Sequence, residues 1–392
     1  MKVVSNCFLN ARVGAAKVMA SNPSWLKPGD EIEIDDVVIG DAIEGNSIWY
    51  HADNNCYYWS GGIDNVEFEL PGKDLSKLTP QDAIAVIVNL KNAIFDRYYN
   101  KHFIIGIGAG VKNDKIDNDL CITFFVSQKD SAGGIIPDYF VFKGYRIPTD
   151  VKSSGIPGSH QYDPNVKYKW VLADKGNIAH CGGGLVDSSG NMCGTRTIYM
   201  SKDKKNYLLT CLHVVALSKI VDTGDHFCPD LSDTIFHFTR AGSPCFKVNR
   251  GSINTLWDYA LIDIGAHDMD NLFPHPYLIS TKISKYYLKE ELKAGIIVYS
   301  FGATSGPQIG SITDPMVDIQ MMVNQQNRSY KGLIRTTKIS EPGDSGAPVV
   351  AVDGRLIGYA VGGLVENTPT ENACTYLIPW YYLNDHLGFK IV

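Results

Sequence analysis

The chain has 392 residues and a formal net charge of −6 at pH 7, a length that predicts two or three domains. Hydrophobic residues make up 44% and charged residues 20%, the composition of an ordinary globular protein. Lysine and arginine form no basic stripe, which argues against nucleic acid or an anionic membrane as the main partner. No apolar run reaches the ~18–20 residues that span a bilayer, and the N-terminus lacks the pattern of a signal peptide. These features predict a cytoplasmic protein.

Residues 1–72 alternate short β-type runs with turns and show no helical periodicity. They contain L-N-x-R at 9–12, L-x-x-G-D at 26–30, W-Y at 49–50 and Y-x-W-S-G at 57–61. With these motifs the segment resembles bacterial SH3-like domains, which implies a small β-barrel that binds a peptide or protein ligand. Two arrangements stay open for its aromatic side chains: all of them pack inside, or they divide between the core and an exposed groove. The residues concerned are Trp49, Tyr50, Tyr58 and Trp59.

Residues 73–158 are expected to form a small α+β domain. Thr79 can cap a helix that starts at Pro80, and apolar residues follow a 3.6-residue period to about Asn100. Strands are expected at 103–111, 120–126 and 139–142, and the unit closes with residues 147–152. The run G-I-G-A-G at 106–110 lacks the third glycine of a dinucleotide site and does not open a helix, so no cofactor is predicted. The unit resembles a module found ahead of trypsin-like domains in some bacterial and plant proteins, and 153–165 is the expected linker.

The most informative motif of the chain is Glu-Pro-Gly-Asp-Ser-Gly-Ala-Pro-Val-Val at 341–350, which places Ser345 on a glycine-flanked turn before an apolar strand. A serine hydroxyl becomes a good nucleophile only where a base takes its proton and nearby donors hold the oxyanion. Gly343 has no Cβ, so its N–H can point with that of Ser345 toward one position. The segment therefore predicts a nucleophile with an oxyanion hole at Gly343 and Ser345.

Two further apolar runs supply a base and an acid. His213 ends the run Tyr-Leu-Leu-Thr-Cys-Leu-His from Tyr207, which we expect to be a strand. Asp258 lies in a second apolar run, where a buried carboxylate needs a partner such as an imidazole N–H. Asp263 is the alternative acid, but it lies five residues further on and faces the opposite side of a regular strand.

The order His, Asp, Ser, with T-C-L-H-V, D-Y-A-L-I and G-D-S-G-A-P-V, resembles the chymotrypsin/trypsin-like serine proteases. The resemblance covers about residues 165–392 and implies a double β-barrel domain with a His213–Asp258–Ser345 triad. It also implies a hairpin at 295–310 and a C-terminal helix at 376–387. The fold class expected for the whole chain is thus mainly β: an SH3-like barrel, a small α/β middle domain and a chymotrypsin-type double barrel.

The same resemblance marks positions for substrate binding. Ile339 lies six residues before the serine, where trypsin has an acid, so cleavage after Lys or Arg is not expected. Val361, Gly362 and Gly363 align with the strand that pairs with substrate backbone, and the two glycines favour an open pocket for an uncharged side chain. Val214 replaces the cysteine that braces the histidine loop in vertebrate digestive members, so that disulfide cannot form.

Nine cysteines, an odd number without a C-x-x-C pair, predict reduced thiols and no metal site. Cys211 lies two residues before His213 and is a weaker alternative nucleophile. Asp344 is expected to be satisfied internally, although ordering of its loop by a ligand or partner is a competing hypothesis. The predicted activity is a serine endopeptidase acting on a specific protein partner. The alternative is a silent or gated protease-fold scaffold whose SH3-like domain binds a protein.

Overall fold

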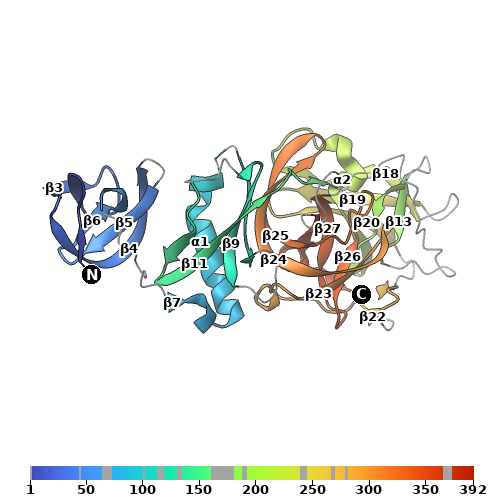
Figure 1. The fold of residues 1–392 in the computed structure, drawn as a ribbon. Helices are drawn as coiled ribbons and strands as arrows, with labels where there is room; N and C mark the ends of the chain where they lie inside the picture. The colour runs from blue at the N-terminus through green and yellow to red at the C-terminus, as the bar shows by residue number, and fades with distance from the viewer. Residues whose placement is uncertain are drawn as a thin grey trace.

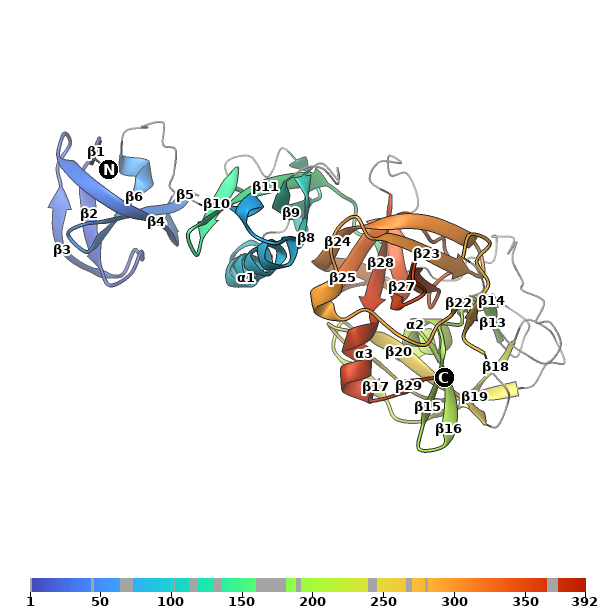
Figure 2. The same ribbon diagram turned by 90° about the horizontal axis from the view of Figure 1, so that it is seen from below.

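The structure is a computed structural model. It describes residues 2–43, 46–63, 73–99, 101, 103–112, 119–129, 135–159, 181–187, 192–238, 245–265, 270–278, 281–364 and 373–392. Across these residues the fold is mainly β, and it forms three successive bodies from the N- to the C-terminus (Figure 1). The same order along the molecule is visible after a quarter turn (Figure 2). No helix in the described part of the chain is both long and apolar enough to cross a bilayer.

The N-terminal body is a six-stranded sheet in the order β1-β4-β5-β6-β2-β3. Its strands are β1 (Lys2–Val4), β2 (Leu9–Val13), β3 (Ser21–Leu26), β4 (Glu31–Ile43), β5 (Asn46–Ala52) and β6 (Cys56–Trp59), followed by a 3-10 turn at Ser60–Gly62. Trp49 and Tyr58 are fully buried, whereas Tyr50 and Trp59 are partly exposed. Trp49 lies opposite Trp59 and Tyr50 opposite Tyr58, so each face of this strand pair carries one buried and one partly exposed ring. Tyr50 and Trp59 pack against the core of this body, and the exposed groove stays a prediction. The SH3-like assignment stays a prediction.

The middle body packs one long helix against a small sheet (Figure 2). Its elements are β7 (Lys73–Asp74), a 3-10 turn at Leu75–Lys77, α1 (Pro80–Tyr99), β8 (Ile104–Val111), β9 (Leu120–Val126), β10 (Tyr139–Phe142) and β11 (Tyr145–Ser153). The helix starts where its sequence predicts, and Thr79 Oγ1 accepts a hydrogen bond from the Asp82 N–H at 3.2 Å. The predicted strands β9 and β10 have the expected bounds, β8 starts one residue later than expected, and β11 is a strand that the sequence did not predict.

The middle sheet continues into the C-terminal body, which the sequence did not predict. β8 pairs antiparallel with β24 (Gly306–Val323), with Ile107 opposite Asp318. A Cβ on Gly106 would lie 2.6 Å from the Asp318 carbonyl oxygen, so glycine at this position permits the close approach. Lys91 of α1 forms a buried ion pair with Asp318 at 2.6 Å. Glycine in the run at 106–110 thus serves strand packing.

The C-terminal body contains a ring of strands in the order β24-β23-β26-β27-β28-β25, closed because β25 also pairs with β24. The other members are β23 (Ile297–Gly302), β25 (Gln326–Thr337), β26 (Pro348–Ala351), β27 (Leu356–Leu364) and β28 (Cys374–Pro379). β23 and β24 form the hairpin expected at 295–310, with Gly302 opposite Gly306. The expected C-terminal helix is shorter than predicted: residues up to Pro379 belong to β28, and α3 spans Trp380–Leu387. Tyr376 and Leu377 pair with β25, and Ile378 pairs with Tyr359 of β27, so strand pairing on both sides keeps this segment extended.

A nine-stranded sheet completes the C-terminal body, with β14-β13-β18-β19-β20-β16-β15-β29 in order and β17 paired to β19. The bounds are β13 (Gly184–Asp187), β14 (Met192–Thr195), β15 (Tyr199–Lys202), β16 (Lys205–Thr210), β17 (His226–Cys228), β18 (Leu231–Phe238), β19 (Cys245–Ile253), β20 (Asp258–Gly265) and β29 (Lys390–Ile391). The remaining elements are α2 (Leu212–Ala216), the two-stranded β21 (Leu272–Phe273) and β22 (Thr281–Lys282), and 3-10 turns at Leu217–Lys219 and Lys289–Glu291. One large apolar core joins this sheet to the closed ring.

Two expectations about local structure were wrong. The chain leaves the strand at Thr210, so His213 lies in the short helix α2 and not at the end of a strand. The predicted linker 153–165 contains a strand, β12 (Gly158–Ser159), which pairs with both β24 and β27. Glycine, proline and serine predict a loop from local preference alone, and tertiary pairing overrides that preference here.

Candidate active site

Three side chains from distant parts of the sequence meet between the closed ring and the nine-stranded sheet. His213 comes from α2, Asp258 is the first residue of β20, and Ser345 lies on the turn before β26. His213 Nδ1 is 2.5 Å from Asp258 Oδ2, and His213 Nε2 is 2.7 Å from Ser345 Oγ. The exposed fractions are 3% for His213 and 0% for the other two. The structure therefore brings all three predicted triad residues within hydrogen-bonding distance.

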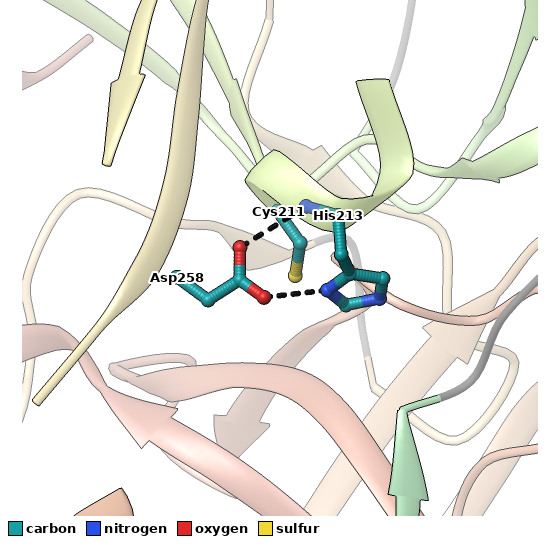
Figure 3. A group of neighbouring side chains, drawn as sticks. All are labelled: Cys211, His213 and Asp258. Carbon is teal, nitrogen blue, oxygen red and sulfur yellow. Dashed lines mark hydrogen bonds and ion pairs between the residues drawn. The ribbon is translucent and has the colours of Figure 1, made fainter. Parts of the chain in front are cut away.

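The carboxylate of Asp258 is held by two backbone N–H groups at the start of α2. Its Oδ1 accepts the N–H groups of Leu212 at 2.6 Å and His213 at 3.2 Å, and Oδ2 faces the imidazole (Figure 3). These N–H groups belong to the first turn of α2, which has no earlier carbonyl to bond. The short helix thus aligns both its own histidine and the acid. A carboxylate only accepts, so Nδ1 donates and Nε2 is left to accept the proton of Ser345.

Asp263, the alternative acid, lies elsewhere. Its Oδ1 accepts the N–H of Gly265 at the partly exposed end of β20. The odd spacing from Asp258 places the two carboxylates on opposite faces of the strand, as the sequence predicts.

The turn that carries Ser345 is held by the residue before it. Asp344 Oδ1 accepts the Thr304 N–H at 2.7 Å, and its Oδ2 accepts the Glu341 N–H at 2.8 Å. Asp344 is thus satisfied within the chain, as expected. Gly343 has φ +96° and Gly346 φ +93°, values that favour glycine, and they form the tight bends on either side of the serine. Gly343 and Ser345 remain the predicted oxyanion donors.

Burial raises the pKa of Asp344 to about 6, because removal from water penalises the carboxylate more than its N–H donors favour it. Both the Thr304 loop and the serine turn depend on the same carboxylate. The protonation state of this group therefore bears on the geometry of the turn.

Cys211 lies beside His213 and Asp258 and is a third titratable group at this site. Its Sγ, a nitrogen of His213 and a carboxylate oxygen of Asp258 all lie within 4.8 Å of one another. Figure 3 shows the three side chains together. Burial and the nearby Asp258 raise the pKa of the Cys211 thiol well above its usual value, and Sγ donates to the Ala360 carbonyl at 3.6 Å. A protonated thiol is a poor nucleophile. These contacts argue against Cys211 as the nucleophile.

Of the predicted substrate-binding residues, Val361 has a contact with the serine. Val361 holds its carbonyl oxygen 3.4 Å from Ser345 Oγ. Gly362 and Gly363 follow on β27, and their edge is paired with β12. Ile339 is 1% exposed and packs in the apolar core inside the closed ring, with its carbonyl accepting the Ser300 hydroxyl at 2.7 Å. Its role at the base of a substrate pocket stays a prediction.

Two tyrosines near Asp258 were missed by the sequence analysis. Tyr359 donates its hydroxyl to the Asp258 carbonyl oxygen at 2.9 Å, and the Tyr330 hydroxyl lies 3.5 Å from Asp258 Oδ2. Both are fully buried. Each sits in an apolar strand pattern that looks like ordinary core, so only the three-dimensional contact identifies them. His102, His160 and His180, which the sequence gave no functional role, lie outside the described residues.

The comparisons with known proteins point to the same part of the chain. Residues 197–358, which include all three residues of the hydrogen-bonded group, match the family model of the trypsin-like peptidase domain. The match supports a trypsin-like protease domain in this part of the chain. No curated protein sequence matches the chain.

Solved structures of serine proteases are similar to about half of the chain. Chymotrypsin from Cellulomonas bogoriensis is 19% identical, with a TM-score of 0.40 over 55% of this chain and 98% of its own. Protease A from Thermobifida fusca is 20% identical, with a TM-score of 0.41 over 55% and 98%. The HtrA-type protease AlgW is 18% identical, with a TM-score of 0.33 over 50% and 51%.

Proposed function

We propose that the protein is a serine endopeptidase that hydrolyses peptide bonds through His213, Asp258 and Ser345. The observation that carries the proposal is the continuous hydrogen-bonded series from Asp258 Oδ2 through the imidazole to Ser345 Oγ, at 2.5 and 2.7 Å. Such a series is the arrangement that makes a serine hydroxyl nucleophilic at neutral pH. The match of residues 197–358 to the trypsin-like peptidase domain supports the same reaction class.

In the proposed reaction Ser345 Oγ attacks the carbonyl carbon of a peptide bond while His213 Nε2 takes its proton. Asp258 holds the imidazole in the tautomer that can accept this proton and stabilises the imidazolium that forms. The N–H groups of Gly343 and Ser345 stabilise the negative oxygen of the tetrahedral intermediate. His213 then protonates the leaving amine, and water hydrolyses the acyl-enzyme by the reverse sequence of proton transfers.

A fluorophosphonate probe tests the assignment because it reacts with an activated serine without needing to resemble the natural substrate. The wild-type protein should be labelled, and Ser345→Ala should not. Ser340 is a buried serine on the same segment, 2.7 Å from Thr375 Oγ1, and Ser340→Ala is the control that should still be labelled. Equal labelling of wild type and Ser345→Ala would falsify the assignment of the nucleophile.

The proposed enzyme should favour an uncharged side chain before the cut bond, because Ile339 stands where the resemblance to trypsin-like proteases puts an acid, and it is packed in apolar surroundings. Profiling with a mixed peptide library measures this preference directly. We expect no enrichment of Lys or Arg before the cut bond, and a dominant Arg preference would contradict the role given to Ile339.

A second candidate function is a scaffold that binds a protein through its N-terminal sheet. The observation in its favour is a group of exposed apolar side chains on this body: Phe8 is 68%, Met19 92% and Trp25 60% exposed. A wild type that folds normally and resists the fluorophosphonate probe would favour this candidate over the peptidase.

A further inference from the structure

The segment before the C-terminal body lies along the predicted substrate strand. β12 pairs antiparallel with β27, with Gly158 opposite Gly363 and Ser159 opposite Gly362. On its other side Gly158 lies opposite Met322 of β24, and the Met322 N–H donates to the Pro157 carbonyl at 2.7 Å. The segment is thus held by the backbones of two strands of the closed ring at once.

The β12 segment runs along β27 in the direction that leads toward Ser345. As the chain advances from Gly158 to Ser159, its partner on β27 changes from Gly363 to Gly362. The next residue of β27 in that direction is Val361, whose carbonyl oxygen is 3.4 Å from Ser345 Oγ. A peptide that enters a serine protease presents the residues before its cut bond as an extended strand, and strand addition to a sheet edge is a general mode of peptide binding.

Glycines lie where β12 meets the edge of β27, and they allow the two backbones to approach closely. A Cβ on Gly362 would lie 2.4 Å from the carbonyl oxygen of Gly158, so the approach requires glycine at that position. A Cβ on Gly158 itself would meet no atom within 4 Å. The contact is therefore formed by backbone, and the bound segment tolerates a side chain on its free side.

The triad is also covered. Ser345 is 0% and His213 3% exposed, so a peptide carbonyl reaches the serine only after atoms that cover it have moved. Since β12 occupies the edge of β27, an incoming peptide that pairs with Gly362 and Gly363 has to displace β12 first.

We propose that Pro157–Ser159 is an intramolecular peptide ligand of the β27 edge, bound in the direction of a substrate, and that outside peptides compete with it. The proposal rests on the proposed peptidase function and names the ligand that occupies its substrate strand. Because the segment is tethered, it competes at a high effective concentration, and hydrolysis of outside peptides is slowed by the fraction of time for which it is bound.

A matched pair of variants at one position tests the docking. Gly158 has a neighbouring strand on both sides, so Gly158→Pro removes an N–H that faces one of them. Gly158→Ala keeps this N–H and adds a methyl group in open space, so it serves as the control. Hydrogen exchange of residues 356–364 is measured in the Ser345→Ala background, where no peptide bond can be cut by the serine. Exchange should be faster in Gly158→Pro and unchanged in Gly158→Ala.

Competition is measured in the full-length active protein with two probes. A small fluorophosphonate reports the nucleophile, whereas tripeptidyl phosphonates ending in alanine or phenylalanine also need the edge of β27. The ratio of peptidyl to small-probe labelling rates should rise about tenfold in Gly158→Pro and stay unchanged in Gly158→Ala, as expected for loss of one strand hydrogen bond.

The two proposals fail in different ways. If the small probe labels no variant, the peptidase proposal is lost, and hydrogen exchange alone decides whether β12 covers β27. If the small probe labels all variants but exchange and the labelling ratio are the same in Gly158→Pro and wild type, the peptidase proposal survives. In that case the intramolecular ligand is rejected.

Discussion

Replacement of Asp258 by asparagine should abolish most of the proposed activity through the histidine tautomer. Oδ1 accepts two backbone N–H groups, from Leu212 and His213, so the asparagine oxygen must occupy this position. The amide NH2 then takes the place of Oδ2 and faces His213 Nδ1, which is 2.5 Å away in the wild type. An NH2 group only donates, so Nδ1 must accept and Nε2 must carry the proton.

With a proton on Nε2, the imidazole cannot take the proton of Ser345. The expected loss in kcat is about 10⁴-fold, or about 5 kcal/mol in the activation free energy. The fold should be retained, because each hydrogen bond of the carboxylate has a counterpart in the amide. The loss is therefore expected in rate and not in thermal stability.

The assay compares fluorophosphonate labelling rates and melting temperatures of Asp258→Asn and Asp263→Asn. Asp263 lies on the same strand but bonds only the Gly265 N–H among the contacts described for its carboxylate, so its variant should be labelled like wild type. Labelling of Asp258→Asn within tenfold of the wild-type rate, in a protein with unchanged melting temperature, would refute the tautomer argument. A similar loss in Asp263→Asn would refute the choice of acid.

Two further predictions concern stability. Burial raises the pKa of Asp344 to about 6, so the folded protein holds this proton more tightly than the unfolded chain. The resulting stabilisation is complete below about pH 4 and is lost as the pH rises through about 6, by about 3 kcal/mol in all. Urea unfolding from pH 4 to 7 should show this fall in wild type relative to Asp344→Asn, and parallel curves would contradict it. Lys91→Met should lower the free energy of unfolding by about 3–5 kcal/mol, because it leaves Asp318 charged and buried. Adding Asp318→Asn should recover part of the loss, and strict additivity would show that the ion pair is not the cause.

The sequence predicts those features that depend on short segments. The helix from Pro80 follows from a capping threonine and an apolar period, and both are local signals. The meeting of His213, Asp258 and Ser345 was expected from three motifs whose order and spacing resemble a known family. The helical conformation around His213 was not predicted, because an apolar run of this length is equally compatible with a strand and with a short helix.

Contacts between distant strands were not predictable in the same way. Asp318 and Ile107 are opposite each other on neighbouring strands, but neither residue type specifies its partner. The pairing of Gly158 with Gly363 was equally unpredictable, because glycine and proline near residue 158 locally indicate a loop. Tyr330 and Tyr359 reach Asp258 only because the closed ring folds β25 and β27 toward β20.

These distant pairings connect the middle body to the candidate active site at two places. β8 extends the sheet at Asp318 of β24, and β12 pairs with Met322 only four residues further along the same strand. Lys91 fixes α1 to Asp318 through a buried ion pair, so movement of the middle body relative to β24 breaks a contact of high energetic cost. The segment that occupies the β27 edge follows directly from β11 of that body. Release of β12 therefore need not disturb the β8–β24 pairing, and the substrate strand can open while the middle body stays attached.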